Sequence, residues 1–315
     1  MKRLLRNQYF LSYSILYIII LALMAFLEHF PVSQPIAVLL IVGVLFSLIA
    51  YKVSKSSVTL SFSRPVQKLE WLVITSLLVY ITYTLTFGIV QIKSLFSPLF
   101  NENEQIREII TLSYKLLLFV IIPFFVYKFA YQFHLKDFGL HVKVKEFFTK
   151  KNAVILIVMF LVLFVFQFFL GNGAKPIREG LISNKQLMIG LPLLYIWLLF
   201  EVGLVEEFFF RSLVQSRLAV LTQSELGGIF LSGILFGLAH APGIYMRGGG
   251  TLDNLGPNPS LIMSVGYSIL VLSVAGFFLS IIWSKTRNLW LVMAIHAFID
   301  LLPGIHEFVN TWKIY

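Results

Sequence analysis

The chain has 315 residues, of which 58% are hydrophobic and 13% are charged, and it contains no cysteine. An ordinary soluble domain carries roughly 25% charged residues, so this composition excludes a soluble enzyme and a disordered chain. The missing cysteine excludes disulfides, thiol catalysis and cysteine metal sites. The net charge of +10 is interpreted through its placement, because basic residues in the loops of a membrane protein set its topology.

Continuous apolar runs follow one another along the chain, as in 153–171. A run of about 20 apolar residues lets a helix cross roughly 30 Å of hydrocarbon, whereas the strands of a membrane barrel alternate apolar and polar residues. We therefore predict an all-α, polytopic transmembrane bundle of about nine helices. The predicted spans are 9–27, 36–51, 71–92, 109–130, 153–171, 187–210, 226–240, 261–283 and 289–302.

The N-terminus carries Lys2, Arg3 and Arg6 before an apolar run that is long for a signal peptide and has no A-x-A cleavage site. We interpret this run as a retained first helix with a cytoplasmic N-terminus, because Lys and Arg are more numerous in the connections on that side. Nine crossings then place the C-terminus outside. We expect the protein to lie in a bacterial plasma membrane. Its expected partners include the lipid bilayer and exclude nucleic acid.

Ionisable residues divide the chain at about residue 150. In 1–150 the predicted helices carry only Lys115 and Lys128, which we place near helix ends where a long stem can snorkel. An ionisable side chain at bilayer depth costs on the order of 2.5 kcal/mol or more, so such residues usually mark function. We therefore predict N-terminal helices of unassigned role (1–150) and a functional domain (151–315). Its helices carry Glu201, Glu206, Glu207, Arg211, His240, His296 and Asp300.

The first motif is Glu206-Glu207-Phe-Phe-Phe-Arg211. Adjacent residues of a helix point about 100° apart, so the two carboxylates face different directions. Arg211 follows Glu207 by four residues and shares its face, which predicts an ion pair. Glu206 is then left to face a cavity, where a desolvated carboxylate suits a general base. A purely structural charge cluster explains the motif equally well.

The second motif is Phe236-Gly-Leu-Ala-His240, with Phe and His on one face. Gly233 and Gly237 form a G-x-x-x-G pair that lets another helix approach closely. Because Ala241-Pro242-Gly243 follows, we expect His240 at the end of its helix. A turn at 222–224 would bring Glu206 and His240 to the same depth, about 25 Å from the turn at 1.5 Å per residue. A packing histidine is the alternative.

The third motif is His296-Ala-Phe-Ile-Asp300, where the two side chains can hydrogen-bond at i, i+4 and fix the imidazole tautomer. The alternative is a polar clasp between helices. If the three motifs form one site, Glu206, His240, His296 and Asp300 line a single polar cavity.

E-E-x-x-x-R, F-x-x-x-H and H-x-x-x-N/D on successive membrane helices resemble the pattern of the CPBP family, the CAAX-protease and bacteriocin-processing group with Rce1-type and lysostaphin-resistance-like members. The similarity covers about 185–303. It implies an intramembrane endopeptidase in which Glu206 activates water with help from His240, while His296 and Asp300 stabilise the oxyanion. Glu207, Arg211 and Phe236 then support the site, and the substrate is a membrane-associated or leader-bearing peptide or protein.

Three alternatives stay open at this point. The chain is a non-catalytic scaffold that binds a membrane-protein partner such as a sensor kinase or a cell-wall enzyme, or it is a proton-coupled transporter with Glu and His as a relay. A zinc ion on Glu206, His240 and His296 is the alternative to a mechanism without a cofactor. The pattern favours the metal-free peptidase.

Overall fold

The computed structural model describes residues 6–54, 66–67, 69–88, 91, 94–95, 97, 103–140, 149–248 and 254–315. This described part is almost entirely helical and contains no strand, which confirms the all-α prediction. Eight of its helices are long and apolar enough to cross a membrane, so the chain is a multi-pass membrane protein. They are Gln8–Leu27, Ser33–Ser54, Glu104–Ala130, Lys150–Leu170, Asn184–Leu221, Glu225–Met246, Leu261–Thr286 and Leu289–Thr311. The remaining predicted span, 71–92, corresponds to the shorter apolar helix Glu70–Tyr83.

Three helices extend beyond the apolar runs that predict them, and for the run 187–210 the helical pattern of the sequence continues to about Leu221. The helix from Asn184 continues to Leu221 and is 38 residues long. Helix α15 (Glu225–Arg247) continues past His240 with Pro242 inside it, so the expectation that His240 ends its helix is wrong. Helix α18 (Leu289–Thr311) likewise continues past Pro303. A proline removes a single backbone donor, and membrane helices tolerate that loss where neighbouring groups satisfy the freed carbonyl.

The chain forms two compact units, and the first comprises Met1–Val90 and Leu213–Thr286. Helix α15 packs against α2, η2, α14, α16, η8 and α17 of this unit. Gly233 and Gly237 face α17 and η8, where an added Cβ at Gly233 would lie 2.5 Å from the ring of Phe277. The close approach predicted for the G-x-x-x-G pair is thereby confirmed. The elements of the unit are α2 (Gln8–Leu27), α3 (Ser33–Val38), η1 (Leu39–Phe46), α4 (Ser47–Ser54), α5 (Glu70–Tyr83), η2 (Thr84–Gly88), α14 (Ser216–Leu221), α15, α16 (Leu261–Tyr267), η8 (Ser268–Leu272) and α17 (Ser273–Thr286).

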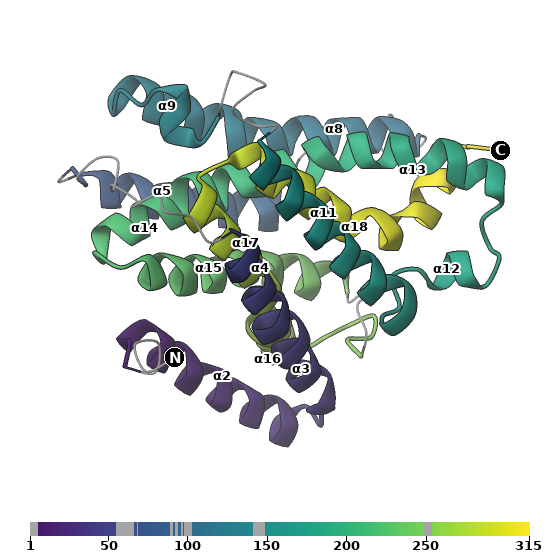
Figure 1. Cartoon of the computed structure of the whole chain (residues 1–315), viewed down its shortest axis with the longest axis horizontal. Coiled ribbons are helices and arrows are strands. Elements are labelled where there is room, and N and C mark those ends of the chain that lie inside the picture. The colour runs from purple at the N-terminus through teal and green to yellow at the C-terminus, as the bar shows by residue number, and fades with distance from the viewer. Residues whose placement is uncertain are drawn as a thin grey trace. The chain divides into compact units, whose positions relative to one another are not determined.

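The second unit comprises Gln91–Ser212 and Arg287–Tyr315. Helix α18 is its centre and packs on α11, α13 and η6 (Figure 1). Apolar side chains such as Leu194, Leu198, Leu301 and Ile305 form the core between α13 and α18. The elements are α8 (Glu104–Leu116), η3 (Leu117–Ile121), α9 (Ile122–Ala130), η4 (Leu135–Phe138), α11 (Lys150–Val165), η5 (Phe166–Leu170), α12 (Lys175–Arg178), α13 (Asn184–Leu198), η6 (Leu199–Leu204), η7 (Glu207–Gln215), which runs on into the first unit, and α18.

These packing units do not test the functional division predicted at residue 150. That division rests on where ionisable residues occur in the predicted helices, and it stays a prediction. The turn predicted at 222–224 is present: α14 ends at Leu221, and Ser224 caps the N-terminus of α15 by accepting from the backbone N–H of Gly227.

Candidate active site

A close approach of two helices in the second unit creates the site. Helix α13 and its continuation η6 run antiparallel to α18, because Gly190 lies against Val309 whereas Gly203 lies against Met293. At Gly203 an added Cβ would fall 2.9 Å from the carbonyl oxygen of Met293, so only glycine allows this spacing. Side chains lean toward the N-terminus of their own helix. Residues a turn beyond this point on either helix therefore lean toward each other.

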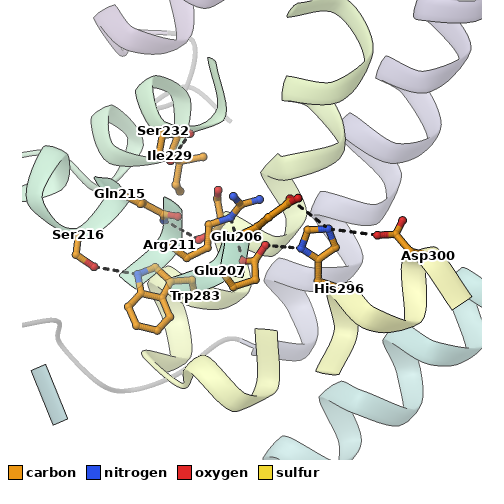
Figure 2. Close-up of polar contacts among 11 residues, drawn as sticks. Glu206, Glu207, Arg211, Gln215, Ser216, Ile229, Ser232, Trp283, His296 and Asp300 are labelled. Atoms are coloured by element: carbon orange, nitrogen blue, oxygen red, sulfur yellow. Dashed lines mark hydrogen bonds and ion pairs between the residues drawn. The ribbon is translucent and has the colours of Figure 1, made fainter. Parts of the chain in front are cut away.

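Glu206 and Glu207 come from one of these helices, and His296 and Asp300 come from α18 (Figure 2). Glu206 lies between two π-helical segments, η6 and η7. π-helical turns are uncommon and frequently occur at functional sites, since they shift the direction in which neighbouring side chains point. The local backbone thus presents two adjacent carboxylates to the same histidine.

His296 connects the cluster. Its Nδ1 lies 2.6 Å from Oε1 of Glu207, and its Nε2 lies 3.9 Å from Oε2 of Glu206 and 3.9 Å from Oδ2 of Asp300 (Figure 2). The Glu207 carboxylate accepts and the imidazole Nδ1–H donates. The tautomer is therefore set by Glu207, and Nε2 faces the other two carboxyl groups.

Arg211 closes the buried end of the cluster. Its Nε lies 3.2 Å from Oε2 of Glu207, and both side chains are fully buried. The ion pair predicted from the i, i+4 spacing is present. A buried charge requires a partner of opposite sign, so Arg211 and Glu207 each supply the partner that the other needs, and Glu207 also accepts from His296.

Exposure rises along the cluster from its buried end. The side chains of Glu207 and Arg211 are 0% exposed, His296 is 8%, Glu206 is 19% and Asp300 is 41%. Glu206 and Asp300 are thus the members that a second molecule can reach. A buried ion pair at one end and partly exposed carboxyl groups at the other are the arrangement expected of a preorganised acid–base site.

The predicted bond between His296 and Asp300 is absent, because their closest atoms are 3.9 Å apart, beyond hydrogen-bond distance. Glu207 fixes the imidazole in place of Asp300. Sequence spacing missed this contact, since Glu207 and His296 are 89 positions apart. Asp300 is instead a neighbour of His296 on the more exposed side of the ring.

Lys115 and Glu201 form a further ion pair in the same unit, which the sequence analysis did not predict. Lys115 lies near the middle of the helix Glu104–Ala130, so the expectation that it snorkels from a helix end is wrong. The long stem turns toward Glu201 because a largely buried charge needs a partner of opposite sign. Both side chains are about a quarter exposed, at 26% and 22%.

His240 belongs to the first unit, where it lies within α15. Its Nδ1 donates to the carbonyl of Phe236 at 2.8 Å, and the two rings meet edge to face with centroids 5.0 Å apart. Because a carbonyl only accepts, this bond places a proton on Nδ1. The meeting of His240 with Glu206 stays a prediction.

Among the described residues, no group of three or more His, Asp or Glu side chains is placed to hold a metal ion. The zinc alternative on Glu206, His240 and His296 stays a prediction, which a chelator tests.

The fold and this cluster define a multi-pass helical membrane protein with an acid–histidine site on two of its long apolar helices. Residues 188–302 match the family model described as Type II CAAX prenyl endopeptidase Rce1-like. Over this range the chain is similar to the Rce1-like proteases of the CPBP family, and the match supports an intramembrane CAAX-type protease in general. The matched range agrees with the 185–303 similarity found by motif. No curated protein and no solved structure matches the chain.

Proposed function

We propose that the chain is an intramembrane endopeptidase that hydrolyses a peptide bond of a membrane-associated or leader-bearing peptide through glutamate-activated water. The observation that carries the proposal is the placement of Glu206: a partly exposed carboxylate beside an imidazole whose other nitrogen is held by a fully buried Glu207–Arg211 pair. The family match supports a protease in general.

In this mechanism Glu206 takes a proton from water as the water oxygen bonds to the scissile carbonyl carbon. The carbonyl oxygen becomes an oxyanion, which His296 stabilises through Nε2 when that nitrogen carries a proton. Asp300 assists when it is protonated. The C–N bond then breaks, and Glu206 returns its proton to the leaving amine. General acid–base catalysis of this kind typically contributes about 10²–10⁴-fold in rate.

Glu207 and Arg211 have a different role in this mechanism. They are buried away from the reacting atoms and keep His296 in one tautomer and one orientation. The motif pattern assigns the assistance of Glu206 to His240, whose Nδ1 donates to the carbonyl of Phe236. That role rests on the sequence pattern and on this hydrogen bond within α15.

The test is complementation of a deletion strain, with membrane levels of each variant measured alongside. We expect that neither Glu206→Gln nor His240→Ala rescues the deletion phenotype, although both proteins reach the membrane. Full rescue by the double variant Glu206→Gln, His240→Ala contradicts the peptidase and favours the scaffold. Rescue should fail in the scaffold case when the first five helices are exchanged for those of a relative.

We further propose a bacterial plasma membrane location with the N-terminus in the cytoplasm. The support is the excess of Lys and Arg in the connections on that side. Because the chain has no cysteine, single cysteines placed near each terminus and labelled from outside whole cells test the topology directly. Labelling of the N-terminal cysteine in intact cells contradicts the proposal, and labelling near Tyr315 supports nine crossings.

A further inference from the structure

Helix α18 carries Pro303 in its interior, a few residues after the site. Proline has no N–H, so the carbonyl of Ile299 loses the helical donor four residues ahead. In the hydrocarbon region no water replaces that donor, and an unsatisfied backbone group there is costly. Ile299 directly precedes Asp300 and follows His296 by three residues. The backbone is therefore weakened at the turn that presents both side chains.

Gln167 supplies the missing donor from a neighbouring helix. Its Nε2 donates to the carbonyl oxygen of Ile299, and the side chain is buried. Gln167 lies in η5, the π-helical end of the helix Lys150–Leu170. A side-chain amide is the group that replaces a backbone N–H with the least change in chemistry.

Two apolar contacts fix the same pair of segments on either side of this bond. The rings of Phe160 and Phe298 stack with centroids 4.2 Å apart and planes 9° apart. An added Cβ on Gly173 would lie 3.1 Å from the ring of Pro303, so the chain passes close to this ring. The contacts align Gln167 with Ile299 and leave the bond little freedom to shift.

We infer that Gln167 is a positioning residue of the site, which holds α18 at Ile299 in place of the donor that Pro303 removes and so keeps His296 and Asp300 directed toward Glu206. The inference rests on the proposed function for its catalytic consequence. The pairing of Gln167 with the carbonyl freed by Pro303 is independent of any activity.

The experiment that tests this inference uses the pairing of Gln167 with Ile299. Pro303→Ala returns an N–H to the helix and makes Gln167 dispensable. Four full-length proteins in lipid nanodiscs are compared: wild type, Gln167→Leu, Pro303→Ala, and the double variant. Gln105→Leu is the matched control, because Gln105 also donates its Nε2 to a carbonyl of α18, that of Thr311, but at the last turn of the helix. The readouts are the unfolding midpoint and the kcat and KM for a peptide that wild type hydrolyses.

We expect Gln167→Leu to lower kcat about tenfold or more per folded molecule with little change in KM, because a buried carbonyl is left unsatisfied beside the reacting groups. In the Pro303→Ala background the same change should lower kcat less than about threefold. The unfolding midpoints should show the same coupling. Gln105→Leu should leave kcat unchanged.

The inference is overturned if Gln167→Leu matches wild type in both readouts, or if its defects are equally large in the Pro303→Ala background. Coupled unfolding midpoints with unchanged kcat contradict the positioning role. If wild type hydrolyses no peptide in a Glu206-dependent manner while the midpoints remain coupled, the proposed function fails and the pairing of Gln167 with Ile299 stands.

Discussion

Among the residues that the structure describes, two buried acid–arginine pairs occur, one in each compact unit. Glu207 pairs with Arg211, both side chains being 0% exposed, and Glu70 pairs with Arg217, at 1% and 2%. The pairs are alike in charge and burial. They differ in what adjoins the carboxylate, and that difference separates a candidate site from a structural contact.

The carboxylate of Glu70 is occupied by the guanidinium of Arg217 and by the backbone N–H of Gln67. The carboxylate of Glu207 is shared between Arg211 and His296, and the imidazole continues to the partly exposed Glu206 and Asp300. A buried pair alone therefore says little about function. A pair that leads through a histidine to open carboxyl groups indicates a place where protons can be exchanged with a bound molecule.

The largest effect on hydrolysis that we expect among single changes, other than at Glu206, is that of His296→Gln. This change removes the imidazole that faces Glu206, and we expect kcat/KM to fall about 10²-fold or more. The unfolding midpoint should fall far less, because Glu207 keeps Arg211 as its partner. The matched control is His306→Gln, a partly buried position on the same helix that contacts Asn310. If the His296→Gln protein keeps most of the wild-type rate, the Glu207–Arg211 pair does not differ in function from the Glu70–Arg217 pair, and the comparison is contradicted.

Removing either arginine should destabilise the protein by a similar amount. Arg211→Ala and Arg217→Ala each leave a carboxylate buried and unpaired, which costs about 3–5 kcal/mol, measured as the free energy of unfolding in lipid or detergent. Per folded molecule, only Arg211→Ala should also lower hydrolysis, because only Glu207 holds His296. Replacing Glu70 and Arg217 together by leucine should recover much of the stability. Equal losses of hydrolysis in both arginine variants contradict the comparison.

A smaller effect is expected at Lys115. Lys115→Met strands Glu201 in a pair that is about a quarter exposed, so solvent screening limits the loss of stability to about 1 kcal/mol. The companion change Glu201→Gln should relieve the defect, as judged by unfolding midpoints of the single and double variants. A double variant as unstable as the sum of both single variants would show that the two side chains act separately.

The smallest expected effect is that of chelation. In the proposed mechanism Glu206 activates water without a metal, so dialysis against a chelator should leave the rate within about twofold of the untreated protein. Hydrolysis that is lost on dialysis and restored by Zn²⁺ supports the zinc alternative on Glu206, His240 and His296 and contradicts the glutamate mechanism.

The sequence predicts the parts of this structure that depend on local spacing. Apolar length locates the membrane helices, and the i, i+4 rule pairs Glu207 with Arg211. Contacts between distant positions were missed, since nothing in the spacing links Glu207 to His296, or Lys115 to Glu201 at 86 positions apart. Helix ends were placed too early at Pro242 and Pro303, because a membrane helix continues where a neighbour such as Gln167 satisfies the carbonyl that proline frees.

The central claim is that Glu206 is the catalytic carboxylate and that Glu70, although also buried with an arginine beside it, is structural. The direct measurement is peptide hydrolysis per folded molecule for Glu206→Gln and Glu70→Gln in lipid nanodiscs, with unfolding midpoints recorded on the same samples. We predict that Glu206→Gln loses about 10²-fold or more in rate at a midpoint near that of wild type. Glu70→Gln should lower the midpoint and keep its rate within about twofold. A Glu206→Gln protein that hydrolyses the peptide at the wild-type rate, or a Glu70→Gln protein that loses as much activity as Glu206→Gln, contradicts the account.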